Sequence, residues 1–308
     1  MHRDVGVTTS EPKVWIISVN LNDLPGLRRT AWSVAGQQDV NLIHLAVDGG
    51  SIDGSVDWCT ERSRREANFR FMPGPDNGIY SAMNRALRVV PPDALVWYLN
   101  AGDFFTHPRV VAEALLALGK AEWVGGPVLA IRQTGRLLYE TASASGRWLP
   151  SQGLFDVPPQ PAVLARKSAI DAAGGFREDL RLASDGILLQ TLATQSVPAQ
   201  YSRPGVAFML GGRSAKHFSR TLAEFRTVHR PPREGLSLWR RDLSLRARTA
   251  LRTLMCEAEE SQHLFGAKLS RVALDYYAFR RRSSSLEPHW KHFREGPADF
   301  TCCISLAR

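Results

Sequence analysis

The chain alternates short apolar runs with segments that carry an apolar residue every three or four positions. Four runs are short and rich in β-branched and aromatic residues, which is typical of buried strands; they cover residues 14–20, 41–50, 69–72 and 94–99. Helical patterns follow them, beginning after Asp23, after the turn at 47–55, at Ile79 and over 108–118. This strand–helix alternation predicts an α/β fold with a mostly parallel, doubly wound sheet.

The pattern between residues 122 and 215 is less regular. It predicts a strand pair over 122–131 and 136–141, and a strand with a helix over 162–175 that ends at two glycines. A buried helix is expected after Asp185, and the apolar residues 208–210 run into the polar segment 211–214.

Polar residues end three of the predicted strands. They are Asn20, Asp48 and the group from Asn100 to Asp103, which follows the run WYL. The carboxyl ends of parallel strands share one edge of a sheet, and ligands bind at that edge. One site built from three turns is therefore expected. The alternative is that each group is only a polar turn after a strand.

Charge divides the chain. Its 308 residues suit one large domain or two small ones, and its formal net charge is +9. Residues 1–212 hold 20 basic and 20 acidic residues, whereas residues 213–308 hold 19 and 10. We therefore predict a tail at 1–13, a main domain at 14–215 and a basic helical extension at 216–308.

The extension carries apolar stripes at helical spacing between residues 236 and 282, next to arginines. Basic amphipathic helices bind anionic membrane surfaces. The alternative is that the two helices pack on the main domain with a solvated basic face.

Other features restrict the protein class. No apolar stretch approaches the roughly 20 residues that span a bilayer, and the first residues lack the apolar centre of a signal peptide. The four cysteines show no metal-ligand spacing. We expect a reduced, cytoplasmic protein, with peripheral attachment to the inner face of the membrane left open by the basic helices.

Five motifs then occur in a fixed order: VDGGSIDGS, PDNGIYSAMNRAL, WYLNAGD, GGFREDLRLASDGILL and LGGRS. Together they resemble family 2 glycosyltransferases over about residues 14–215, in the branch that assembles polysaccharides and glycolipids. The resemblance implies a GT-A fold and inverting transfer of a sugar from a nucleotide-sugar donor to a glycan or lipid-linked acceptor. It also implies Mg²⁺ or Mn²⁺ as cofactor.

The resemblance also assigns roles to residues. Asp103 becomes the metal ligand, and Asp185 the base that takes the acceptor's proton. The implied donor-binding residues are Asn20, Asp48, Gly49, Ser51, Asp76, Asn77, Gly78, Asn84, Asn100, Ala101 and Gly102. Simpler interpretations stay open, because Asp48 and Asp185 (or Ser184) could be helix caps and Asp76 a turn residue.

These residue types suit the chemistry. A departing nucleoside diphosphate gathers negative charge, which a divalent cation offsets. Mg²⁺ needs only one or two protein carboxylates when phosphates and water complete its shell. An inverting transfer also needs a base for the acceptor hydroxyl. Asp185 lies among apolar residues, where an idle carboxylate would be costly to bury.

Two positions depart from the family pattern. Pro159 precedes Gln160 where the family has histidine, and Ser81 stands where an acid is usual. Two rival functions are a sugar nucleotidyltransferase and a nucleic-acid-binding protein. The first lacks its Gly-rich basic loop after residue 20, and the second lacks a reader motif, so we do not expect nucleic acid as a partner.

Overall fold

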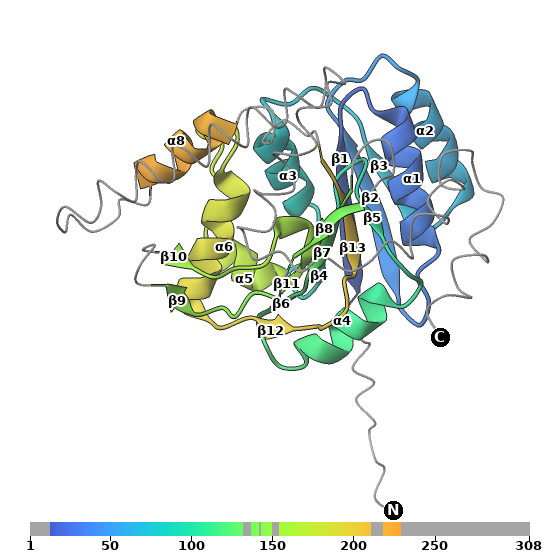
Figure 1. Ribbon diagram of the computed structural model, residues 1–308. Helices are drawn as coiled ribbons and strands as arrows, with labels where there is room; N and C mark the ends of the chain where they lie inside the picture. The colour runs from blue at the N-terminus through green and yellow to red at the C-terminus, as the bar shows by residue number, and fades with distance from the viewer. Residues whose placement is uncertain (1–12, 132–136, 142, 150–153, 211–217, 229–308) are drawn as a thin grey trace, which may run out of the picture.

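A seven-stranded sheet forms the centre of the computed structural model, which describes residues 13–131, 137–141, 143–149, 154–210 and 218–228 (Figure 1). The strand order is β12-β6-β11-β4-β1-β2-β3. In chain order the strands are β1 (Val14–Asn20), β2 (Leu42–Asp48), β3 (Phe69–Met72), β4 (Leu95–Tyr98), β6 (Trp123–Gly125), β11 (Val163–Arg166) and β12 (Ala199–Gln200).

The pairing confirms the predicted mostly parallel sheet. Strand β1 is parallel to both β2 and β4, and β2 is parallel to β3. Strand β11 runs antiparallel to its neighbours β4 and β6. Strand β11 therefore runs against the other six strands of this sheet, and it follows a first half of strand–helix repeats.

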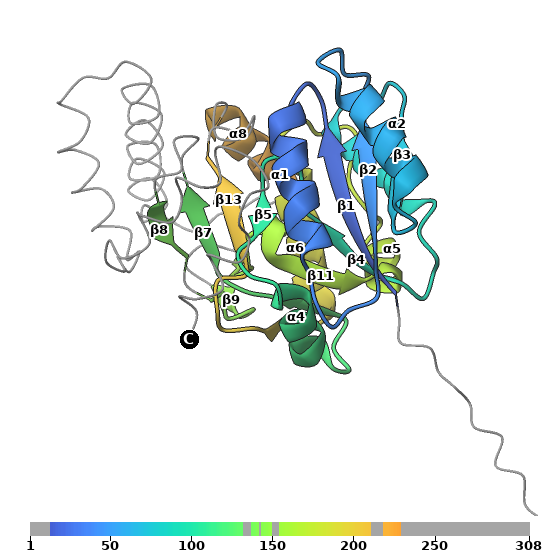
Figure 2. The same cartoon turned by 90° about the vertical axis from the view of Figure 1, so that its right-hand side faces the viewer.

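Helices cover both faces of this sheet (Figures 1 and 2). They are α1 (Leu24–Ala35), α2 (Ser55–Arg65), α3 (Ile79–Leu87), α4 (Val110–Leu118), α5 (Lys167–Ala172) and α6 (Ser184–Gln195). In β1, Trp15 and Ile17 point into a core with α3, α5 and α6, whereas Val14 and Ile16 belong to a second core with α1 and α4. Burial on both faces explains why these strands read as continuous apolar runs.

A smaller four-stranded sheet, in the order β5-β13-β7-β8, packs beside α1. Its strands are β5 (Phe104–Phe105), β7 (Val128–Ile131), β8 (Leu137–Glu140) and β13 (Val206–Met209). A two-stranded ribbon, β9 (Trp148–Leu149) with β10 (Leu154–Phe155), and the 3₁₀ turn η1 (Gln160–Ala162) precede β11.

The prediction of one strand over 122–131 is wrong. The segment divides at Gly125 and Gly126 into β6 and β7, which lie in different sheets. A Cβ atom on Gly126 would lie 2.1 Å from Cε2 of Tyr201, so only glycine lets that ring approach. Strand β13 covers 206–209 and so includes part of the apolar run at 208–210.

Helix α8 (Phe218–Val228) packs against α6 and the segment that leads into it. The Glu224 carboxylate accepts hydrogen bonds from the backbone amides of Leu182 (2.7 Å) and Ala183 (3.2 Å), and from that of Arg181. The Phe225 ring lies 3.3 Å from where a Cβ atom on Gly186 would be. These contacts anchor the start of α6.

Helix α8 falls in the predicted extension at 216–308, and the boundary at 215 stays a prediction. The amphipathic stripes between 236 and 282 lie outside the described residues. Within the described ranges, no helix combines the length and apolar character needed to cross a bilayer.

Replacing the anchoring carboxylate should weaken the fold. Glu224→Ala leaves three amides at the start of α6 without their acceptor, so the free energy of unfolding should fall by about 1–3 kcal/mol. The measurement is urea unfolding of the variant and of Arg220→Ala, which changes an exposed residue of the same helix. Equal stability of the two variants would contradict the anchoring role.

Candidate functional site

The three polar strand ends meet at one edge of the sheet, as predicted. Asn20 and Asp48 are register partners at the ends of β1 and β2. The amide of Leu99 donates to the carbonyl of Ile17 (2.9 Å), and that of Ala101 donates to the carbonyl of Val19 (3.2 Å). The end of β4 therefore lies beside the end of β1, as parallel pairing requires.

Asp48 is fully buried, and its carboxylate organises the turn that follows β2. Oδ1 accepts hydrogen bonds from the amides of Gly50 (2.9 Å) and Ser51 (2.7 Å). Oδ2 accepts from Asn20 Nδ2 (2.8 Å) and from the Ser51 hydroxyl (2.7 Å). Four donors therefore hold this carboxylate, so Asp48 shapes the turn whether or not it contacts a nucleobase.

Two side-chain amides at this edge have a buried oxygen that accepts no hydrogen bond within the described residues. These oxygens are Asn20 Oδ1 and Asn100 Oδ1. Unpaired buried acceptors cost free energy, and native structures hold few of them. A ligand with hydrogen-bond donors, or a cation, would satisfy both oxygens.

The loop before α3 lies against the Asp48 turn. Asp76 Oδ1 accepts a hydrogen bond from the amide of Gly78 (2.9 Å), which is the turn predicted as its simpler role. A Cβ atom on Gly49 would lie 2.8 Å from Asp76 Oδ2, so the two loops touch only because residue 49 is glycine. Gly78 has φ +120°, a conformation that favours glycine.

Arg85, which sequence reasoning missed, ties these loops together from α3. Its guanidinium donates to the carbonyls of Gly74 (2.9 Å) and Asp48 (3.3 Å). Its place in the motif PDNGIYSAMNRAL was the signal that could have identified it.

Asp103 is bonded to β13 and lies close to Asp23 and Arg29. Its Oδ1 accepts from the amide of Met209 (2.9 Å), and Gly102 turns the backbone with φ +99°. Burial raises the pKa of Asp103 to about 7; the Met209 amide and the Arg29 guanidinium oppose that rise, and the carboxylate of Asp23 adds to it.

The donors around Asp103 fit a hard divalent cation. Asp103, Asp23 and Asn100 offer oxygen atoms, the ligand type that Mg²⁺ and Mn²⁺ prefer. In the part of the chain that the structure describes, no cluster of three or more His, Cys, Asp or Glu side chains could hold a metal by itself. A cation here would therefore need further oxygens from a bound diphosphate or water.

Asp185 lies in the first turn of α6. Its Oδ1 accepts from the Tyr80 hydroxyl (3.0 Å) and from the amide of Gly186 (2.9 Å). Burial raises the pKa of Asp185, and the Gly186 amide and the Tyr80 hydroxyl oppose that rise. The N-cap of α6 is Ala183, so the interpretation of Ser184 or Asp185 as the cap is wrong.

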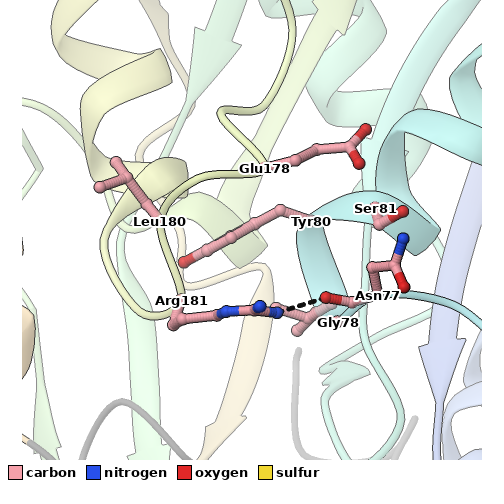
Figure 3. Close-up of a pocket in the computed structure, with 8 residues that line it drawn as sticks. Asn77, Gly78, Tyr80, Ser81, Glu178, Leu180 and Arg181 are labelled. Carbon is pink, nitrogen blue, oxygen red and sulfur yellow. Dashed lines mark hydrogen bonds between the residues drawn. The ribbon is translucent and has the colours of Figure 1, made fainter.

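A small pocket lies beside Tyr80, between residues 77–81 and the group Glu178, Leu180 and Arg181 (Figure 3). The Arg181 guanidinium lines it and donates to the carbonyl of Asn77. The pocket thus joins the loop before α3 to the segment before α6.

The side-chain amide of Asn84 is hydrogen-bonded to that segment before α6. Its Oδ1 accepts from the amide of Phe176 (3.0 Å), and its Nδ2 donates to the Phe176 carbonyl (2.8 Å) and to Glu178 (2.9 Å). These contacts give Asn84 a structural role, and its donor-binding role stays a prediction. Gln160, after the missing histidine, donates to the carbonyl of Tyr98 (3.1 Å) at the end of β4.

Part of the chain is similar to known glycosyltransferases. Residues 15–150 match the family model described as Glycosyl transferase family 2. "Uncharacterized glycosyltransferase Rv1514c" and "Uncharacterized glycosyltransferase MT1564", from two strains of Mycobacterium tuberculosis, are each 41% identical over 112 residues, which is 36% of this chain. The chain spans about two fifths (41%) of the length of these curated relatives.

Solved structures share the fold at low identity. The mannosyltransferase PcManGT from Pyrobaculum calidifontis, in complex with GDP-Man and Mn²⁺, has a TM-score of 0.54 at 16% identity, covering 88% of this chain and 82% of that one. S. aureus TarS 1-349, in complex with UDP-GlcNAc, has a TM-score of 0.55 at 13% identity, covering 92% and 87%. The fold is therefore GT-A, as expected.

Asp48 should matter for folding before any ligand binds. In Asp48→Asn, the new NH₂ group faces hydrogen-bond donors whichever way the amide turns, so the free energy of unfolding should fall by about 1–3 kcal/mol. Urea unfolding without ligand measures this loss. Asp57→Asn, on the exposed side of α2, is the matched control, and an Asp48 variant as stable as this control would remove the structural role.

Proposed function

We propose that this chain, whose residues 15–150 match the model of glycosyl transferase family 2, transfers a sugar from a nucleoside diphosphate sugar to an acceptor hydroxyl with inversion. The observation that carries the proposal is the pair of unpaired amide oxygens, Asn20 Oδ1 and Asn100 Oδ1, at the edge where three polar strand ends meet. A donor nucleotide supplies the hydroxyl and imino hydrogens, and the associated cation, that such oxygens need.

The donor lies in this proposal along the Asp48 turn and the loop before α3. The base and ribose contact the turn at 48–51, and the diphosphate follows residues 76–78 towards Asn100 and Asp103. The amides at the start of α3 favour an anion there, because a helix N-terminus carries partial positive charge. PcManGT and TarS were solved with GDP-Man and UDP-GlcNAc, so both nucleotide classes are candidates.

Mg²⁺ or Mn²⁺ would be held by Asp103, with Asn100 and Asp23 nearby. When bound, the cation offsets the charge that the diphosphate gains as it leaves. The chain's own contribution is to hold Asp103 still, through the Met209 amide on Oδ1. The mannosyltransferase PcManGT was solved with Mn²⁺.

Asp185 acts in this proposal as the base. Its carboxylate takes the proton of the acceptor hydroxyl while that oxygen attacks the anomeric carbon and the bond to the diphosphate breaks. The raised pKa of Asp185 makes its carboxylate a stronger proton acceptor than an exposed one. The start of α6 is anchored by Glu224, which limits the movement of this carboxylate.

The acceptor is proposed to be a glycan or lipid-linked sugar in cell-surface polysaccharide or glycolipid assembly, and the transferred sugar a hexose. The excess of basic residues in 213–308 supports peripheral attachment to an anionic membrane through residues 236–282, next to a lipid-linked acceptor. A sugar nucleotidyltransferase is the rival, and it would release pyrophosphate rather than a nucleoside diphosphate.

Metal-dependent donor binding should require Asp103. Asp103→Asn removes the charged ligand and keeps the shape of the side chain, so Mn²⁺-dependent binding of UDP or GDP should weaken at least tenfold. Isothermal titration with and without Mn²⁺ measures this, with Asp93→Asn on the exposed loop before β4 as control. Unchanged Mn²⁺-dependent affinity in the Asp103 variant would refute the assignment.

Turnover should depend on Asp185 far more than donor binding does. Asp185→Asn cannot accept the proton, so kcat should fall by about 10²–10⁴, the usual contribution of a positioned base. Release of UDP or GDP from a donor sugar in the presence of acceptor extracts measures turnover, and the titration above measures binding. A variant that keeps more than half of the wild-type rate would move the base to another residue.

A further inference from the structure

We propose that Tyr80 is a positioning residue for Asp185, because its hydroxyl holds one carboxylate oxygen and leaves the other for the acceptor. The inference rests on the proposed role of Asp185 as base. Tyr80 lies 105 positions before Asp185 in the sequence, in the first turn of α3. Neither the motif nor its spacing indicates this contact.

The geometry of the carboxylate carries the argument. The Tyr80 hydroxyl donates to Oδ1 at 3.0 Å, and the Gly186 amide donates to the same oxygen at 2.9 Å. Both bonds therefore occupy Oδ1, and Oδ2 is the oxygen that they leave for an acceptor hydroxyl. Two donors from different elements also fix the rotation of the carboxylate, which a single bond would not.

Tyr80 carries the proton of its hydrogen bond to Asp185. Burial, and then the negative charge of Asp185, raise the pKa of the Tyr80 phenol, so the phenol stays protonated where the carboxylate is ionised. The hydrogen bond stabilises the ionised carboxylate and so lowers the pKa of Asp185, against the effect of burial. Tyr80 thereby keeps a buried base ionised to lower pH.

Tyr80 is itself held in place. Its ring stacks on that of Phe176, with centroids 5.8 Å apart and 11° between the ring planes. The backbone of Phe176 is held on both sides by Asn84, one turn after Tyr80 on the same face of α3. The loop at 76–78, proposed to line the donor, leads directly into this helix. Donor loop and base are thus attached to one rigid element.

Five charged side chains on the surrounding elements have other partners. Lys167 and Asp171 of α5 pair with each other, and Glu224 of α8 binds the backbone of 181–183. In the segment before α6, Arg181 binds the Asn77 carbonyl and Glu178 accepts from Asn84. Tyr80 is therefore the side chain to vary for a local effect on Asp185.

The test is Tyr80→Phe, which keeps the ring stack and removes only the hydroxyl. The titration of Asp185 is followed by carboxyl ¹³C NMR in protein labelled at aspartate, with the signal assigned by its loss in Asp185→Asn. Loss of a hydrogen bond to the ionised form should move the Asp185 midpoint about one pH unit upward. The acidic limb of kcat should move by the same amount, and activity should recover at higher pH.

Tyr98→Phe is the matched control. Tyr98 is also buried, packs edge-on against the same Phe176 ring at 5.0 Å, and donates to the backbone carbonyl of Met83 at 3.1 Å. It should leave the Asp185 titration unchanged. An unchanged midpoint in Tyr80→Phe, or an equal shift in both variants, would overturn the proposal.

One further measurement covers the case in which Tyr80→Phe is unstable. If Tyr80→Phe does not fold, the ¹³Cζ chemical shift of Tyr80 at neutral pH, compared between Asp185→Asn and the unaltered chain, reads the same hydrogen bond from the other side. That shift should move when the charged acceptor is replaced, and an unchanged shift would refute the contact. The NMR titrations need no substrate, so a failure to find sugar transfer would refute the proposed function and leave the test of Tyr80 intact.

Discussion

Burial of both faces of the central sheet is the constraint on which the rest of this structure depends. A strand with apolar cores on either side has no solvated face for polar chemistry, so polar groups gather where the strands end. The polar side chains within the strands support this interpretation, because Ser18 and His44 bond to each other at 2.9 Å and Ser18 also reaches the carbonyl of Leu99. Burial lowers the pKa of His44 to about 3, with a smaller effect from Arg62, so this histidine is a neutral structural group.

The edge that results is built in two parts. The Asp48 turn and the loop at 76–78 contact each other through Gly49, where any larger residue would meet the Asp76 carboxylate. Asp103 belongs to the second part, where it is bonded to Met209 of the smaller sheet. In the proposed function, the nucleoside diphosphate of the donor contacts both parts.

Helix α3 connects this edge to the second half of the chain. Tyr80 and Asn84 lie one turn apart on one helical face, and both contact the segment from Phe176 to Asp185. A short helix is stiff, so a displacement of the loop before it would be passed on to α6. The anchoring of α6 by Glu224 from α8 adds a second support, which comes from a part of the chain beyond the predicted main domain.

The sequence by itself determined the elements that local chemistry specifies. Apolar runs marked β1, β2 and β4, and Asp23 capped α1 as its position before Pro25 indicated, with its carboxylate on the amide of Gly26 (3.0 Å). The sequence also indicated that Asn20, Asp48 and Asp103 lie at one edge of the sheet, because parallel strands have their carboxyl ends at the same edge. Only the tertiary structure decided the partners of Asp103 and Asp185, which are 106 and 105 residues away, and the division of 122–131 between two sheets. Such contacts depend on how separate elements pack, and no local pattern of residues records that packing.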